Sequence, residues 1–223
     1  MIYAKRGLIV LVTAVGFLSI AASAAQAEGN WRIEGGSISA TKKVATTSTG
    51  DVTIEIPEGG SVFSVLCKEF AIDEFSLLVK GFVSGQMLLT KCELFSSGKK
   101  IGCIVEVVTP KFKGELFLHE ERSFVLILPE TGTALFTLKF TPKEECPVET
   151  PITGSMVLQD VTSGGSSWSP ELVEHEVKFA SAKLFPKDVL KYGTGGPTVG
   201  FIGPTLHFSL TGADAGKKWS GLG

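Results

Sequence analysis

The sequence is poor in the residues that most metal sites and many enzymes require. It contains three histidines and four cysteines in 223 residues, and no two of the cysteines form a C-x-x-C pair. The histidines are not spaced like ligands beside the cysteines, so a zinc site is not expected. We therefore predict that the protein holds no metal and no cofactor.

Sequence motifs of common enzyme classes are also missing. The serines in Gly154-Ser155-Met156 and Gly165-Ser166-Ser167 lack the G-x-S-x-G pattern of a nucleophile elbow. The glycine-rich run at 192–197 resembles a loop and does not open a helix, as a phosphate-binding loop would. We assign no catalytic residue and favour a protein that is not an enzyme. The alternative is a secreted hydrolase that uses a glutamate pair or a metal held by histidines.

An excess of positive charge is missing as well. The formal net charge is −2, and it would become −4 if Lys5 and Arg6 were removed with the first 27 residues. Nucleic-acid binding needs clustered lysine and arginine to neutralise phosphates. We therefore expect no nucleic-acid partner. Asn30 is the only asparagine, so the chain has no N-x-S/T glycosylation site.

The N-terminus has the pattern of a secretory signal peptide. Lys5 and Arg6 precede an uncharged stretch, residues 7–27, which ends in small residues and an A-x-A cleavage site at Ala25-Gln26-Ala27. This pattern predicts a signal peptide over 1–27 and a secreted, extracytoplasmic mature protein. The stretch is also long enough to remain as a membrane anchor, so cleavage and retention both stay open. No later stretch is long and apolar enough to span a membrane as a helix.

The four cysteines fit a secreted protein because disulfides persist in oxidising compartments. Cys67, Cys92, Cys103 and Cys146 allow three pairings, and the sequence alone does not choose between them. We prefer Cys67–Cys92 with Cys103–Cys146, since the other two pairings cross or nest. On the chain-entropy model, loops of these lengths contribute about 3.5 and about 4 kcal/mol to stability.

The chain after residue 27 shows the pattern of short strands separated by turns. Val52, Ile54 and Ile56 alternate with polar neighbours, and Pro57-Glu58-Gly59-Gly60 follows as a turn. About ten such strands predict an all-β fold after the signal helix, either an antiparallel β-sandwich or an irregular β-barrel. The expected strands cover 31–33, 51–56, 61–68, 75–80, 86–93, 101–108, 114–119, 122–128, 133–140, 151–159, 173–180 and 205–210.

These strands are expected to form a single domain over 28–223. If the chain divides at all, the polar segment 141–149 is the best place for a boundary. Residues 81–85 are expected to join two strands as a longer hairpin loop. Residues 186–189 could begin one short helix, and 193–197 has the composition of an open loop. The chain from Thr211 is expected to be a loose tail.

The strongest catalytic candidate is Glu174-His175-Glu176, because a histidine between carboxylates could act as a base or bind a metal. On a strand, however, neighbouring side chains point to opposite faces. His175 alternates in register with apolar residues, which favours a core or edge histidine bonded to the backbone. His119 lies at an expected hairpin tip, and His207 is expected to face away from the interior. The three histidines could still converge in space.

The tryptophans are the best binding candidates in the sequence. Trp31, Trp168 and Trp219 lie in expected loops or strand ends, where an exposed indole can stack on a sugar or anchor a protein partner. This suggests an extracellular carbohydrate- or peptide-binding module whose partner is a cell-surface polymer or a protein. The simpler interpretation is that each tryptophan covers one end of the core.

Short motifs between Cys67 and Ser155 are shared with other secreted chains: Cys67-Lys68, Lys91-Cys92, Gly102-Cys103, Gly114-Glu115-Leu116, Leu128-Pro129 before Gly132-Thr133, Phe136, Cys146 and Ile152-Thr153-Gly154-Ser155. In these features the chain resembles a set of uncharacterised secreted β-rich proteins of actinobacteria, over about half of the mature chain. The resemblance implies secretion, two disulfides and a β-rich body, and it implies no activity. We therefore expect a secreted, disulfide-stabilised β protein with a surface, structural or binding role.

Overall fold

The computed structural model describes residues 29–58, 60–142, 146–162, 164, 167–180, 183–193 and 195–222. The predicted signal peptide, 1–27, lies outside these described residues. Within them, no helix combines the length and the apolar character needed to cross a membrane.

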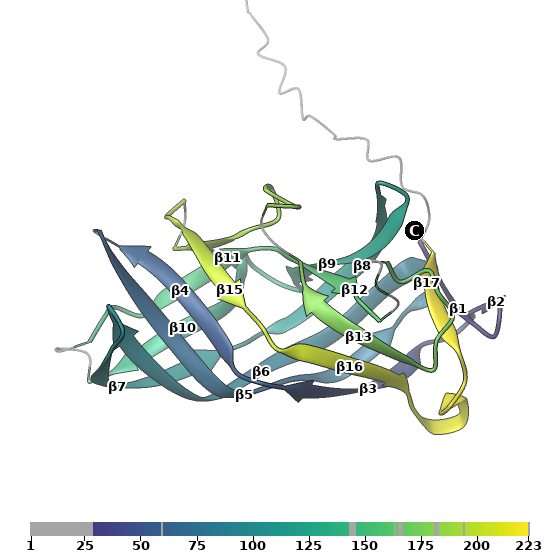
Figure 1. Cartoon of the computed structure of the whole chain (residues 1–223), viewed down its shortest axis with the longest axis horizontal. Helices are drawn as coiled ribbons and strands as arrows, with labels where there is room; N and C mark the ends of the chain where they lie inside the picture. The colour runs from purple at the N-terminus through teal and green to yellow at the C-terminus, as the bar shows by residue number, and fades with distance from the viewer. Residues whose placement is uncertain are drawn as a thin grey trace, which may run out of the picture.

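Antiparallel strands make up most of the described chain, which confirms the predicted all-β class. The helices found in the described ranges are two short 3₁₀ turns, η1 (Val79–Gly81) and η2 (Gly212–Asp214). The two longest strands, β5 (Ser61–Leu77) and β6 (Phe82–Ser96), form a hairpin that runs along most of the molecule (Figure 1).

Most strands belong to one large sheet that closes on itself. Its hydrogen-bonded order is β10-β11-β14-β15-β4-β5-β3-β16-β13-β12-β9-β8-β6-β7, and β7 pairs again with β10. Besides β5 and β6, the members are β3 (Lys42–Thr49), β4 (Val52–Glu58), β7 (Lys99–Val108), β8 (Lys111–His119), β9 (Arg122–Pro129), β10 (Ala134–Thr141), β11 (Thr150–Gly154), β12 (Met156–Asp160), β13 (Glu174–Phe179), β14 (Leu190–Tyr192), β15 (Thr198–Ile202) and β16 (Thr205–Leu210).

The sheet has two halves, because β5 also pairs with β6 across the closed order. In one half, β4, β15, β14, β11, β10 and β7 complete a ring with the first part of β5 and the last part of β6. In the other half, β3, β16, β13, β12, β9 and β8 complete a ring with the remaining parts. Figure 1 shows the first half on the left and the second on the right.

The chain passes repeatedly from one half to the other through short interruptions. β7 leads into β8 across Thr109-Pro110, β11 into β12 across Ser155, and β15 into β16 across Gly203-Pro204. Proline lacks the N–H that a sheet ladder needs, so strands tend to break or bend at these points. The sequence predicts the break at Pro110, but it treats 151–159 as one strand and does not predict β15.

One segment expected to be a loop is part of a strand. Residues 82–85 belong to β6 and pair with β8, so the prediction of a loop over 81–85 is wrong. The turn is η1, where Lys80 and Gly81 have φ of 62° and 75°. Glycine suits this conformation, and a Cβ on Gly81 would lie 2.6 Å from the backbone of Gly29. The expected short helix at 186–189 is likewise a turn, and β14 and β15 pair on either side of the predicted open loop.

The C-terminal segment is ordered, so the expectation of a loose tail is wrong. After η2, β17 (Trp219–Leu222) pairs with β1 (Asn30–Ile33), which also pairs with β2 (Gly36–Ser37). This small sheet lies at the end of the molecule marked by β1, β2 and β17 in Figure 1. The order comes from a long-range pairing and from the full burial of Trp219, neither of which local composition signals.

The inner faces of the strands form one large apolar cluster that extends through both halves. The alternation predicted the inward side chains correctly on several strands. Val52, Ile54 and Ile56 of β4 are buried, and so are the alternate residues Phe136, Leu138 and Phe140 of β10 and Leu206, Phe208 and Leu210 of β16. The sheet also continues across 141–149, because β10 and β11 on either side of that segment pair directly.

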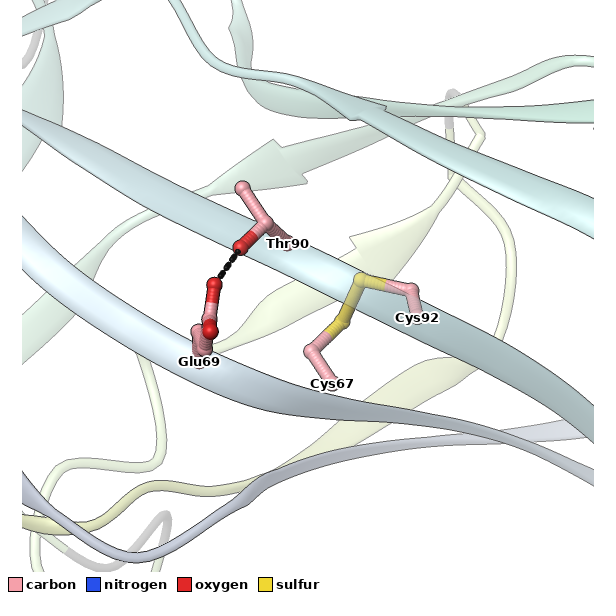
Figure 2. Close-up of a disulfide and its surroundings, with 4 residues drawn as sticks. All are labelled: Cys67, Glu69, Thr90 and Cys92. Atoms are coloured by element: carbon pink, nitrogen blue, oxygen red, sulfur yellow. Dashed lines mark hydrogen bonds between the residues drawn. A yellow bond between two sulfur atoms is a disulfide. The ribbon is translucent and has the colours of Figure 1, made fainter.

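The two disulfides have the preferred pairing, Cys67–Cys92 and Cys103–Cys146. Cys67 of β5 lies directly opposite Cys92 of β6 (Figure 2), where the shared hairpin passes from one half to the other. In the same view Thr90 donates a hydrogen bond of 2.7 Å to Glu69. Cys103 lies on β7, and Cys146 lies in the segment before β11. Disulfides of this kind are typical of proteins in oxidising compartments.

Candidate functional site

The three tryptophans lie together in the interior and are not available to a ligand. Trp31, Trp168 and Trp219 have no exposed surface, and their ring centroids are 5.7–5.8 Å apart. The interpretation that they form a binding surface is therefore wrong, and the simpler interpretation, that they cover an end of the core, is confirmed. They come from β1, the β12–β13 connection and β17, which meet at the end of the sheet beside the small sheet. We call these three residues the tryptophan plug.

Close backbone contacts hold the tryptophan plug in place. The indole Nε1 of Trp31 donates a hydrogen bond of 2.9 Å to the carbonyl oxygen of Phe82, just after η1. Gly221 of β17 passes so close that a Cβ there would lie 2.5 Å from the Trp31 ring. Its N–H donates to the carbonyl oxygen of Trp168. The plug therefore ties both ends of the described chain to the β5–β6 hairpin.

His175 is part of the same buried cluster, which confirms the prediction of a core histidine bonded to the backbone. Its ring is stacked on Trp168, and its Nε2 lies 2.9 Å from the carbonyl oxygen of Trp219. Because that oxygen can only accept, Nε2 must carry a proton. Nδ1 lies 2.5 Å from Asp160 Oδ2, so the carboxyl group is the hydrogen-bond partner of the second ring nitrogen.

Asp160 is the partner that sequence reasoning missed. It is fully buried, and its Oδ1 accepts hydrogen bonds from the N–H and the hydroxyl of Thr162. Nothing in the strand pattern marks Asp160, because its pairing with His175 depends on the β12–β13 alignment. Since His175 and Asp160 have no exposed surface and satisfied polar atoms, they act as a structural pair that positions the Trp219 backbone.

The remaining histidines do not assemble a reactive centre. His207 is partly exposed and lies 3.2 Å from Glu174, and His119 ends β8 and contacts Phe185, as expected for an outward residue and a hairpin tip. Glu174 and Glu176 face away from His175, toward solvent. Among the described residues, no group of three histidine, cysteine or carboxylate side chains is placed to hold a metal ion.

A small cavity of about 50 Å³ lies where β11 passes into β12. Its polar side chains are Ser155 and Asp188, whose hydroxyl and carboxylate are 3.0 Å apart. The other walls are mostly apolar, including Met156, Phe179 and Leu190. None of the described histidines lines this cavity, so Ser155 lacks the imidazole base of a nucleophilic triad there. The cavity is too small for an organic substrate.

A larger cavity, of about 530 Å³, lies at the end of the sheet opposite the tryptophan plug. We call it the mouth cavity. Its lining residues come from the start of β5, the start of β7, the segment leading into β11 and the end of β14, and most of them are apolar: Phe63, Ile101, Cys146, Pro147, Val148, Thr150 and Tyr192. Its volume falls in the range of small-molecule sites, which also occur at the mouths of closed sheets.

The strand register explains why these side chains face inward. Phe63 of β5 lies between two register partners, Ser96 on β6 and the buried Ile56 on β4. Tyr192 pairs with the buried Ile152. Paired residues share a face of the sheet, so Phe63 and Tyr192 project into the closed space, above residues that belong to the core.

A disulfide fixes one wall of the mouth cavity. Cys146 bonds to Cys103, which is buried on β7, so the segment from Cys146 to Thr150 is held against the rim. The hydroxyl of Thr150 donates to the carbonyl oxygen of Val148 over 2.9 Å. Val148 is 80% exposed, which leaves an apolar side chain at the entrance. The sequence did not predict β14 as a strand, and it did not indicate that the core ends before the rim.

Comparison with models of known protein families, with curated proteins and with solved structures finds no match to this chain.

Proposed function

We propose that this chain is a secreted, disulfide-stabilised β protein that binds an apolar small molecule in the mouth cavity. The proposal includes a barrel in place of a sandwich, an inference supported by a strand order that returns to its first member. The single observation that carries the proposal is the cavity of about 530 Å³ at one end of the closed sheet.

The lining predicts what kind of molecule the cavity accepts. Phe63, Ile101, Pro147 and Val148 offer only carbon atoms, while Tyr192 and Thr150 add hydroxyl groups. Binding would remove apolar surface of both the ligand and the wall from water, which favours association. Each methylene buried is worth about 0.8 kcal/mol, or about fourfold in affinity. A flexible hydrocarbon chain fits this chemistry better than a sugar, which needs several converging polar groups.

The test is a series of linear alkanols of increasing length. Octanol, nonanol and decanol would compete with the neutral fluorophore N-phenyl-1-naphthylamine for the oxidised protein, and fluorescence would report displacement. Affinity is expected to rise by about fourfold per methylene until the cavity is full. A series without length dependence, or a fluorophore that never binds, would contradict the proposal and favour a purely structural protein.

Two isoleucines of β7 provide a matched pair of variants. Ile101 lines the cavity, whereas Ile104 is 71% exposed on the outside of the sheet. Ile101→Glu would place a carboxylate against the hydrocarbon chain and is expected to abolish displacement, because burying an unpaired charge is costly. Ile104→Glu should leave alkanol affinity unchanged. Equal losses in the two variants would place the binding site elsewhere.

A further inference from the structure

We infer that the ligand of the mouth cavity is an amphipath with an anionic carboxylate head group, which Lys99 binds at the rim while the hydrocarbon chain occupies the cavity. This inference rests on the proposed function and adds the class of ligand. It depends on the placement of Lys99, on the ion pairs of other lysines, and on where a head group would lie relative to water.

The register places Lys99 on the inner face at the rim. Lys99 pairs with Ser96, and Ser96 pairs with Phe63, which lines the cavity. These three residues form one row across β7, β6 and β5, so they share a face of the sheet. Lys99 also precedes the lining residue Ile101 by two positions, and side chains two apart on a strand point the same way.

Among the described residues, Lys99 has no carboxylate within ion-pair distance. Lys139 of the adjacent β10 has none either, but its register partner Glu106 lies on the outer face of β7. Lys100, the neighbour of Lys99, points to the outer face and lies 2.5 Å from Glu93. Lys68 pairs with Asp51, and Lys91 pairs with Glu69. Lys99 is exposed, so its ammonium group can meet an incoming anion without first breaking an ion pair within the described structure.

The geometry separates the two parts of an amphipath. A hydrocarbon chain lying between Phe63 and Tyr192 would be removed from water, whereas its carboxylate would stay at the solvent boundary, where a charge keeps most of its hydration. The exposed Glu149 carries a negative charge just before β11. In the sheet, β10 separates β11 from β7, which carries Lys99. The head group is therefore expected on the β7 side of the mouth.

The experiment compares decanoate with decanol at neutral pH, using displacement of N-phenyl-1-naphthylamine from the oxidised protein. Lys99→Met should weaken decanoate binding by about two- to fivefold, the effect of losing one solvent-exposed ion pair, and Lys99→Glu should weaken it further. Neither change should alter decanol binding. Lys100→Met, one residue away on the opposite face, is the matched control and should leave both affinities unchanged.

The outcomes separate this inference from the proposed function. If both probes bind but Lys99→Glu affects them equally, the head-group assignment is overturned and the apolar site stands. If Lys100→Met weakens decanoate binding as much as Lys99→Met does, the carboxylate responds to the total positive charge of this surface. The specific role of Lys99 is then overturned. If neither probe displaces the fluorophore, both proposals fail. Loss of the decanoate effect in high salt, with decanol unaffected, would add support.

Discussion

At one end of the closed sheet, three tryptophans fill the interior with no exposed surface, whereas at the other end Phe63, Ile101 and Tyr192 surround a cavity of about 530 Å³. The filled end is covered by the small sheet β17-β1-β2, and the β12–β13 connection adds Trp168. The end with the cavity is bounded by the segment before β11 and by the Cys103–Cys146 disulfide.

The difference shows two ways in which the ends of a closed sheet can be built. Bulky aromatic residues on segments that fold back over the end exclude water and add to the core. A disulfide can hold a rim in place without filling the space inside it. One end of the sheet therefore contributes to stability, whereas the other end has space for a ligand.

The largest effect is expected from removing a tryptophan of the plug. Trp31→Ala should lower the free energy of unfolding by about 3–5 kcal/mol, because it leaves a large cavity in a site fixed on all sides. Tyr192→Ala at the mouth should cost less than about 1.5 kcal/mol, since its ring is already partly in water. Urea denaturation of both variants measures the difference, and equal losses would refute the assignment of stability to the plug.

Breaking the buried pair beneath the plug is the next test. Asp160→Ala removes the partner of His175 and the acceptor of two Thr162 hydrogen bonds, and it should cost about 3–5 kcal/mol, as expected when one member of a buried pair is lost. Glu174→Gln, which alters the partly exposed contact with His207, should stay within about 0.5 kcal/mol. A small loss for Asp160→Ala would mean that the pair is not structural.

The two disulfides should differ in their effect on ligand binding more than in their effect on stability. Replacing both members of either pair with serine is expected to cost about 2–4 kcal/mol in urea denaturation. Only the Cys103–Cys146 variant should also weaken decanol binding, because Cys146 belongs to the wall of the mouth cavity. A loss of binding in the folded Cys67–Cys92 variant alone would contradict the placement of the site.

The smallest effect concerns an ion-pair cluster on the way to β17. Hydrogen bonds from Lys217 and Lys42 hold the pKa of the Asp214 carboxyl below its usual value. The contribution of this group to stability is therefore present above the ordinary aspartate pKa and is lost as the pH falls through the lowered one. Lys217→Met should raise the Asp214 pKa toward the ordinary aspartate value, measured by carboxyl NMR titration. An unchanged pKa would show that the contact is absent in solution.

Particular residues show how far the sequence could predict this structure. The alternation of Val52, Ile54 and Ile56 gave the inward face of β4 correctly, because burial of one face imposes a period of two. The burial of His175 followed from the same rule. Its partner Asp160 could not be predicted, since the pair depends on which strands align. The sequence left open whether the tryptophans are exposed or cover the core, because polar and glycine residues are found both in exposed loops and in loops that cover a core.

By itself the sequence determined the all-β class, the inward residues of several strands and a preference for the disulfide pairing, because these depend on local alternation and on the order of residues along the chain. Only the tertiary structure decided that the sheet closes, that Trp31, Trp168 and Trp219 meet at one end, and that a cavity remains at the other. The physical reason is distance along the chain. Both ends of the closed sheet are built from segments far apart in sequence, so whether an end is filled or left open depends on contacts that no local pattern contains.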